Sequence, residues 1–401
     1  MRILHTADWH MNNSLGRVDL SGHIVGALEQ IAVMLDEHRV DVMLVAGDLF
    51  SERSRPDQMK AAIGEIKRLF TPFLSRGGTI AAIAGNHDSE VFFETLRDAL
   101  DLVSPGREKQ NGLDATGRLY LAPNPRLLRL SDPTGQVVQI GLLPYPTPRC
   151  YLRGEGASYA SVEEKHRKVQ AGFVEALQLM QSRLDVSLPS VLASHIHVRG
   201  AQSHSLYRIS EVDDVVFEPS DVPAHFAYVA YGHIHKPGPV GDSSHVRYCG
   251  SIARLDAAER DDQKEVVIVD VGAGGRLGEP TSLSLSSTPF YQIEITDPDA
   301  QMPRLREDYP EHERALVSCT LHWTPGRHNL GALQRELSRT FPLCYARRIE
   351  EAGRERARLS FTPRQMSDVH GTTRDFLRRK LEGHASRDEL LQMADELLAS
   401  D

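Results

Sequence analysis

The sequence predicts an α/β fold, with a layered core of β-sheets covered by helices and a smaller α+β region after it. Two observations support this class. Over residues 1–286, short apolar runs that end at glycine alternate with segments whose apolar residues recur at helical spacing. Over residues 287–370, strand-like runs instead flank a single helix. Strands and helices in regular alternation are typical of layered α/β domains.

The N-terminal segments, taken in order, support the α/β fold class. Apolar runs closed by Gly47 and Gly85 are typical of buried strands, and the segments between them have the amphipathic spacing of helices. In order, we expect a strand at 2–4, a helix at 24–35, a strand at 42–46, a helix at 59–70 and a strand at 79–84.

The middle of the chain continues the pattern. We expect strands at 137–143, 190–193, 226–230, 246–249 and 266–269, and a long helix at 162–184. A glycine-rich turn at 272–280 should join two strands. Beyond it, we expect strands at 291–295, 316–322 and 356–361, with a helix at 329–341. The predicted division is a core domain at 1–286, a capping domain at 287–370 and a helical segment at 371–401.

The final segment carries a helix signature. Ser386 stands three residues before Glu389, the pattern of a capping box at a helix start. An apolar stripe follows, formed by Leu390, Leu391, Met393, Ala394, Leu397 and Leu398. Two interpretations stay open: the helix packs on its own domain, or it docks on another protein.

Composition limits the functional classes. The chain has 401 residues, a formal net charge of -9 and a pI of about 6.1, so it has no overall basic character for gripping nucleic acid unaided. Binding to DNA would therefore need a local patch, metal ions or a partner. Four separated cysteines without a C-x-x-C pair indicate free thiols. With neither an apolar leader nor a membrane-length run, we expect a cytoplasmic protein without membrane association.

Five short motifs carry the chemistry, and each directly follows a predicted strand. They are Asp8-Trp9-His10, Gly47-Asp48-Leu49-Phe50, Gly85-Asn86-His87-Asp88, Ser194-His195 and Gly232-His233-Ile234-His235. Sites in α/β sheets form beyond the carboxyl ends of strands, so motifs distant in sequence can meet there. Carboxylate, imidazole and amide donors suit divalent manganese, iron or zinc. Asp48 is the natural bridging ligand for a metal pair that would clamp the oxygens of a phosphoryl displacement.

Each motif alone has a plainer structural explanation. Asp48 could cap a helix, and Gly85 and Asn86 could simply form a tight turn, which both residue types favour. His195 could be an ordinary partly buried histidine, and His197 competes with it for the same role. The complete set, in order after five strands, is what predicts a two-metal centre.

This set resembles the calcineurin-like metallophosphoesterases and, more closely, the SbcD family of bacterial nuclease subunits. The resemblance covers the first 285 residues or so and is only loose in the capping domain. It is densest at His5-Thr6-Ala7-Asp8, Gly47-Asp48-Leu49-Phe50, Leu142-Leu143-Pro144-Tyr145, Tyr228-Val229-Ala230-Tyr231-Gly232-His233-Ile234-His235-Lys236 and Arg247-Tyr248-Cys249-Gly250-Ser251-Ile252. It implies a layered β-sandwich core flanked by helices.

The resemblance also implies the ligands. One metal would be held by Asp8, His10, Asp48 and His235, and a second by Asp48, Asn86, His195 and His233. The spacing to Gly200-Ala201 favours His195 over His197. His87 would stabilise the transition state or protonate the leaving oxygen, and Asp88 would orient His87. Some positions depart from the family pattern, among them Trp9, Ser51, the stretch Met11-Asn12-Asn13-Ser14 and the surroundings of Ala257.

The activity implied is manganese-dependent cleavage of DNA, as an exonuclease on double-stranded ends and an endonuclease on hairpins or single strands, in break repair and recombination. The partners implied are DNA and the coiled-coil ATPase SbcC, with a homodimer inside a heterotetramer. The sequence has no G-x-x-x-x-G-K-[ST] phosphate loop, which agrees with ATP use by a second subunit. The capping domain would contact DNA, and the C-terminal segment or the stretch Phe376 to Leu381 would dock the ATPase. Two rivals remain: a phosphatase of the same superfamily acting on nucleotides or other phosphoesters, and a non-catalytic scaffold.

Overall fold

The computed structural model describes residues 1–52, 54–102, 112–152, 159–201, 214–221, 225–351, 369–381 and 386–398. The chain forms two compact units, Met1–Ile349 and Glu350–Asp401, and each is described below by itself. The strand expected at 356–361 lies outside the described residues.

The first sheet of the larger unit has the strand order β16-β15-β1-β4-β5-β6. Its strands are β1 (Arg2–Thr6), β4 (Val42–Val45), β5 (Thr79–Ile83), β6 (Leu119–Ala122), β15 (Glu265–Gly272) and β16 (Gly275–Ser284). β1, β4, β5 and β6 run parallel, while β15 and β16 form an antiparallel hairpin beside β1. The carboxyl ends of β1, β4 and β5 therefore meet at one edge of the sheet.

The second sheet has the order β13-β14-β12-β9-β8-β7. Its strands are β7 (Arg126–Ser131), β8 (Val137–Leu143), β9 (Ser190–His195), β12 (Tyr228–Gly232), β13 (Gly238–Val240) and β14 (Ser243–Tyr248). The central four run parallel, and β7 and β13 close the two edges antiparallel. β9 and β12 are neighbours, so their carboxyl ends also lie together.

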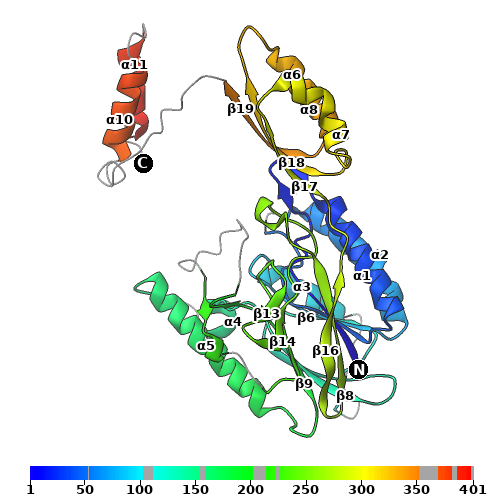
Figure 1. Cartoon of the computed structure of the whole chain (residues 1–401). Helices are drawn as coiled ribbons and strands as arrows, with labels where there is room; N and C mark the ends of the chain where they lie inside the picture. The colour runs from blue at the N-terminus through cyan, green and yellow to red at the C-terminus, as the bar shows by residue number, and fades with distance from the viewer. Residues whose placement is uncertain are drawn as a thin grey trace. The chain divides into compact units, whose positions relative to one another are not determined.

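The two sheets pack face to face, with helices on both outer faces. Alternate side chains of β1 show how this works, since Ile3 faces the second sheet and Leu4 faces the helices on the other side. The helices α1 (Ser21–Glu37), α2 (Pro56–Ser75) and α3 (Glu90–Leu102) cover the first sheet, and α5 (Val162–Ser182) covers the second. In Figure 1, α1 and α2 lie side by side, with α5 on the opposite side. This layered α/β arrangement confirms the predicted fold class.

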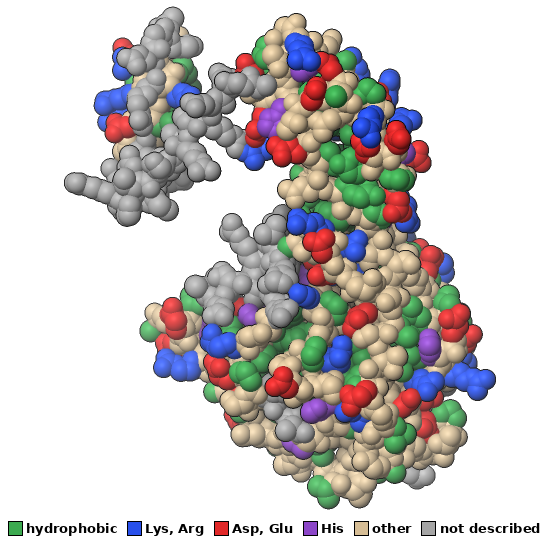
Figure 2. Space-filling model, in the orientation of Figure 1, with side chains coloured by type: hydrophobic (Ala, Val, Ile, Leu, Met, Phe, Trp, Pro, Cys, Tyr) green, Lys and Arg blue, Asp and Glu red, His purple; other side chains and the backbone are tan. Residues whose placement is uncertain are grey.

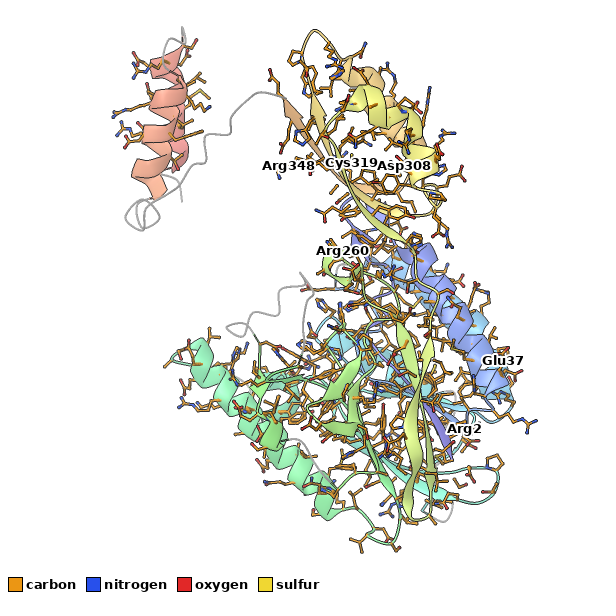
Figure 3. All side chains as sticks on the ribbon, in the orientation of Figure 1. Arg2, Glu37, Arg260, Asp308, Cys319 and Arg348 are labelled. Carbon is orange, nitrogen blue, oxygen red and sulfur yellow. The ribbon has the colours of Figure 1, made fainter. Side chains whose placement is uncertain are left out.

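Hydrogen bonds from side chains of β1 hold this strand against the neighbouring elements of the core. The Arg2 guanidinium, labelled in Figure 3, donates to both carboxylate oxygens of Asp270 on β15 at 2.8 and 2.9 Å, and to the carbonyl of His38 after α1. Between the sheets, His5 Nδ1 lies 2.9 Å from the hydroxyl of Tyr228 on β12. Burial lowers the pKa of His5 to about 3, so its ring stays neutral inside the core.

Short elements complete this part of the unit. They are the strands β2 (Ser14–Leu15), β3 (Val18–Asp19), β10 (His197–Val198) and β11 (Val216–Phe217), the helix α4 (Pro148–Tyr151), and the 3-10 turns η1 (Pro219–Asp221) and η2 (Ala257–Glu259). All four cysteines are unpaired, as expected. No helix among the described residues has the length and apolar character needed to cross a bilayer.

Residues 290–351 form a small three-stranded sheet with helices. The order is β17-β18-β19, from β17 (Phe290–Ile295), β18 (Leu316–Trp323) and β19 (Cys344–Glu351). The helical elements are α6 (Pro298–Gln301), η3 (Met302–Arg304), α7 (Leu305–Asp308) and α8 (Leu330–Thr340). Ile293, Val317 and Leu337 share a separate core here, while Leu316 joins the core under α1 and α2. The boundary at 286/287 stays a prediction, as do the other two domain limits.

The smaller unit contains α10 (Val369–Lys380) and α11 (Arg387–Leu398), which pack against each other. Arg374 of α10 and Asp395 of α11 form an ion pair at 2.8 Å. On α11, Leu390 and Met393 keep 37% and 54% of their surface exposed, which leaves apolar surface without cover in this unit.

One predicted turn is shorter than expected. The glycine-rich stretch 272–280 was expected to be a turn, but β15 ends at Gly272 and β16 begins at Gly275. The pairing register shifts between Ile268 and Asp270, and opposite this irregularity Gly278 has a φ of +75°. Val269 here lies opposite the three residues from Gly278 to Pro280, so the irregularity accommodates two extra residues in β16, and Pro280 is tolerated because β16 is an edge strand.

Candidate metal centre

The predicted ligands all lie at the carboxyl ends of parallel strands. Asp8 and His10 follow β1, Asp48 follows β4 and Asn86 follows β5, all from the first sheet. From the second sheet, His195 ends β9, and His233 and His235 follow β12. Because the sheets pack face to face, these loops converge on one pocket, whose carboxylates and imidazoles are buried.

The first group of donors gathers around His10. Its Nε2 atom lies 3.1 Å from Nε2 of His235 and 3.5 Å from Oδ2 of Asp48. Donor atoms of Asp8, His10 and His235 all lie within 4.8 Å of one another. Nε2 of His10 and Nε2 of His235 thus face each other beside the carboxylates of Asp8 and Asp48. This arrangement is expected when the lone pairs of the ligands point at a shared cation.

The second group of donors gathers around Asn86. Its Oδ1 atom lies 3.0 Å from Nε2 of His195 and 3.0 Å from Nδ1 of His233. His195 Nε2 is also 3.4 Å from Oδ2 of Asp48, the same oxygen that faces His10. One oxygen of Asp48 thus stands between the two groups, as a bridging ligand would.

Backbone strain concentrates on these residues. Among the described non-glycine residues, six have a positive φ, and four of them are proposed ligands: Asp8 (50°), His10 (47°), Asp48 (53°) and His233 (94°). Such conformations cost of order 1–3 kcal/mol each and persist where function requires them. The neighbouring backbone stabilises them, since the amides of Asp8 and His10 donate to the carbonyls of Gly47 and Asp48 at 3.0 and 2.9 Å.

Glycine at position 85 is a steric requirement of the site. A Cβ atom on Gly85 would overlap the carboxylate of Asp48, although the backbone conformation itself has no positive φ. The loop after β5 can therefore approach the loop after β4 only with glycine here. That close approach lets the amide of His87 donate to Oδ1 of Asp48 at 2.8 Å, which leaves Oδ2 for the histidines.

The electrostatics of the pocket agree with a site for cations. Burial opposes charge on Asp48, yet His195 and His10 beside it hold its pKa well below the usual range. Burial likewise opposes charge on His195, but Asp48 raises its pKa to about 9. Protonated imidazole thus balances the carboxylate, in the place that a metal ion would take. When bound, two divalent cations supply positive charge against a phosphodiester and make hydroxide available near neutral pH.

Comparisons with known proteins agree with this geometry. Residues 1–237 match the family model described as calcineurin-like phosphoesterase. The chain is 31% identical to the SbcD subunit of the SbcCD nuclease of Bacillus subtilis over 287 residues, which cover 68% of this chain and 67% of the relative. This chain belongs to the SbcD family. The SbcD protein of Escherichia coli is 26% identical over 75% of this chain and 70% of its own, and that of Rhodobacter capsulatus is 27% identical over 68% and 67%. The enzyme is accordingly a metal-dependent phosphodiesterase.

In this SbcD-family site, oxygen atoms behind two histidines fix their ring orientation. His195 Nδ1 donates to the carbonyl of Ala46 at 2.7 Å, and His235 Nδ1 donates to Glu259 at 2.8 Å. Each ring therefore presents Nε2 to the pocket. Partners of this kind set the tautomer of metal-binding histidines and strengthen them as ligands.

Glu259 is itself held by a buried lysine. Lys264 and Glu259 expose 0% and 1% of their side chains, and Nζ of Lys264 lies 2.7 Å from Oε2 of Glu259. Lys264 also donates to the hydroxyl of Ser251 at 2.9 Å and to the carbonyl of His235 at 3.1 Å. Burial opposes charge on Glu259, but His235 and Lys264 lower its pKa to about 2. His235 is thus connected to Lys264 twice: directly through its backbone carbonyl, and from its ring by way of Glu259.

Asp88 links the loops that carry two of the ligands. Its carboxylate accepts the amides of Gly85 at 2.9 Å, Phe50 at 3.0 Å and Leu49 at 3.2 Å. Burial and the nearby charge of Asp48 raise its pKa to about 7. These contacts are with backbone, so the expected role in orienting His87 stays a prediction. The ring of His87 is half-buried, with its centroid 5.0 Å from that of His10.

His197 lies on the far side of His233 from the proposed ligands. Its Nδ1 atom is 3.3 Å from Asp214, which also contacts His233 and the hydroxyl of Tyr145. Sequence reasoning did not single out Asp214, Glu259 or Lys264. No motif surrounds Asp214, and the charged stretch 256–264 has the composition of an exposed loop. Tyr145 did stand in the Leu142–Tyr145 motif, which could have drawn attention to it.

Proposed function

We propose that this protein is a two-metal DNA nuclease that uses manganese, degrades double-stranded ends and cleaves hairpins or single strands during break repair. The observation that carries the proposal is the single Asp48 oxygen that lies 3.5 Å from His10 Nε2 and 3.4 Å from His195 Nε2. Support for a nucleic acid as the substrate comes from relatives named as nuclease subunits.

The proposed ligand sets are those implied by the resemblance. Asp8, His10, Asp48 and His235 would hold one cation, and Asp48, Asn86, His195 and His233 the other. His87 lies at the edge of the pocket, next to both Asp48 and His10, where it could reach a phosphate oxygen. We propose that it stabilises the transition state or protonates the leaving oxygen, while the buried ligands hold their positions.

The test is a nuclease assay on the purified full chain. We expect manganese-dependent cleavage of double-stranded ends and of a hairpin, with p-nitrophenyl phosphate as a monoester control. Replacing His87 with Ala should lower cleavage by about 10²–10⁴-fold, the usual contribution of a proton-transfer group, while two manganese ions stay bound. Rapid hydrolysis of the monoester with no action on either DNA would contradict the proposal and favour a phosphatase.

A partner ATPase belongs to the same proposal. The relatives carry the name of a two-part nuclease, SbcCD, and the net charge of -9 gives this chain little basic surface for DNA. On the face drawn in Figure 2, Lys and Arg side chains are interspersed with Asp and Glu. We propose that residues 287–370 contact DNA, that an SbcC-type ATPase supplies further affinity, and that two copies of each chain form a heterotetramer.

The docking segment can be tested directly. Deleting the residues beyond Thr372 should abolish co-purification with the ATPase, because α11 offers the exposed apolar side chains of Leu390 and Met393. The pair Leu390→Ser and Met393→Ser should weaken it without deleting the segment. As a matched control, Val33→Ser on α1 changes an apolar residue that is as exposed as Met393, and it should have no effect. Co-purification that survives the deletion would rule this segment out.

A further inference from the structure

A buried carboxylate stands behind the proposed ligand His233. Asp214 is 6% exposed, and its Oδ2 atom lies 2.6 Å from Nε2 of His233. The other ring nitrogen of His233, Nδ1, faces the pocket 3.0 Å from Oδ1 of Asn86. His233 therefore has one nitrogen on Asp214 and the other toward the second group of donors.

The contact between Asp214 and His233 is a hydrogen bond rather than part of another cation site. His197, Asp214 and His233 do have donor atoms within 4.8 Å of one another. However, the pocket donors that converge on the proposed cations are 3.0 to 3.5 Å apart. The 2.6 Å separation is shorter than these and is typical of a charge-assisted hydrogen bond to a carboxylate. The proton must therefore lie on Nε2 of His233, since an ionised carboxylate only accepts.

This proton position decides what the other nitrogen can do. A neutral imidazole carries one proton, so a ring that donates through Nε2 keeps a free lone pair on Nδ1. In the opposite tautomer, Nδ1 would donate to Oδ1 of Asn86, 3.0 Å away. That hydrogen bond would engage the two atoms, Nδ1 of His233 and Oδ1 of Asn86, through which these residues are proposed to bind the metal. Asp214 favours the tautomer that keeps both available.

Asp214 is in turn held in place by several neighbours. Its Oδ1 atom accepts from the hydroxyl of Tyr145 at 2.8 Å and from the amide of Val215 at 2.8 Å. On the other side, Nδ1 of His197 lies 3.3 Å from Oδ2. The ring of Tyr145 also packs beside that of His233, with centroids 5.7 Å apart. Both the carboxylate and the ring it contacts are thus fixed.

We propose that Asp214 is a positioning residue that holds His233 in the Nε2–H tautomer and so prepares Nδ1 for the second of the two cations. The inference rests on the proposed function, because it assigns His233 to that cation. It predicts that losing the carboxylate weakens the second cation alone. Within the described part of the chain, the residues that bond to Asp214 include His233 but no donor of the first group.

The experiment compares the full chain with Asp214→Asn, which keeps the size of the side chain, and with Glu218→Gln as a control. Glu218 is half-exposed and pairs with Arg199. Calorimetric titration with Mn²⁺ should show one of the two sites of Asp214→Asn lose about 10–100-fold in affinity, the usual effect of removing such a partner, with the other site unchanged. The spin-coupled signal of a manganese pair in electron paramagnetic resonance should give way to that of single ions. Glu218→Gln should match the parent.

A measurement on the parent alone keeps the proposal testable if Asp214→Asn unfolds. In metal-free protein with ¹⁵N-labelled histidine, the ring shifts of His233 should identify the Nε2–H tautomer. An Nδ1–H tautomer would overturn the proposal, as would Asp214→Asn retaining both affinities and the coupled signal, or losing both sites together. A parent that binds no pair of manganese ions would instead refute the proposed function on which this inference stands.

Discussion

Replacing Asp48 with Asn should remove both cations and with them all measurable DNA cleavage. The same Asp48 oxygen faces His10 of the first group of donors and His195 of the second, so its loss should affect both groups. Asn keeps the shape of the side chain but lacks the charge that balances two divalent ions. The loss in manganese affinity should exceed about 100-fold, the upper range when only a supporting partner of a ligand is lost. Calorimetry and the nuclease assay measure the two effects.

A matched control for this variant is Asp57→Asn. Asp57 pairs with Arg55 at the start of α2, and both side chains are about 70% exposed. Binding of manganese and cleavage should both match the parent. If Asp48→Asn still bound two manganese ions, the bridging role of Asp48 would be wrong, whatever its activity.

Replacing Lys264 with Met should destabilise the folded protein by about 3–5 kcal/mol, the range for breaking one partner of a buried ion pair. Lys264 and Glu259 are both enclosed in the protein, so the variant would leave the carboxylate of Glu259 buried beside His235 without its lysine partner. Urea denaturation measures the change in the free energy of unfolding. The first cation should also bind more weakly, because the Glu259 carboxylate behind His235 would keep, among the described residues, only the hydroxyl of Ser251 and the amide of Leu255 as partners on its other oxygen.

Lys168→Met gives the corresponding control. Lys168 pairs with Glu164 at 2.8 Å on the surface of α5, with half of the lysine side chain exposed. Exposed pairs of this kind contribute about 0–1 kcal/mol. Similar destabilisation by both lysine variants would show that burial of the Lys264–Glu259 pair has no special weight. A double variant, Lys264→Met with Glu259→Gln, should recover part of the stability.

The sequence predicts the core of the fold well because the spacing of apolar residues indicates which faces of each strand or helix are buried. β4 and β5 are buried on both faces, so each reads as a continuous apolar run, and α1 and α2 bury one face each. The segments that were missed lack such a signal. β19 (Cys344–Glu351) is largely exposed and rich in charged residues, and its order of apolar and polar residues does not indicate a strand. Its pairing depends on β18 beside it.

The proposed ligands were accessible to sequence reasoning for a similar reason. Each sits in a short motif behind a strand, and the strand order of parallel sheets brings such ends together. The carboxylates behind the histidines were not accessible. Asp214 reaches His233 from a segment with no recognisable motif, and Glu259 lies in a stretch whose charge predicts exposure, although it is 1% exposed. Only the folded structure shows which histidine nitrogen each carboxylate meets.

The most direct test of the account is anomalous diffraction from crystals of the full chain soaked in manganese. Two peaks should appear about 3.5–4 Å apart, the usual separation in two-metal sites, with Asp48 between them and Nδ1 of His233 directed at one. A single peak, or peaks remote from Asp48, would contradict the central claim that these two sheets converge to hold a pair of cations.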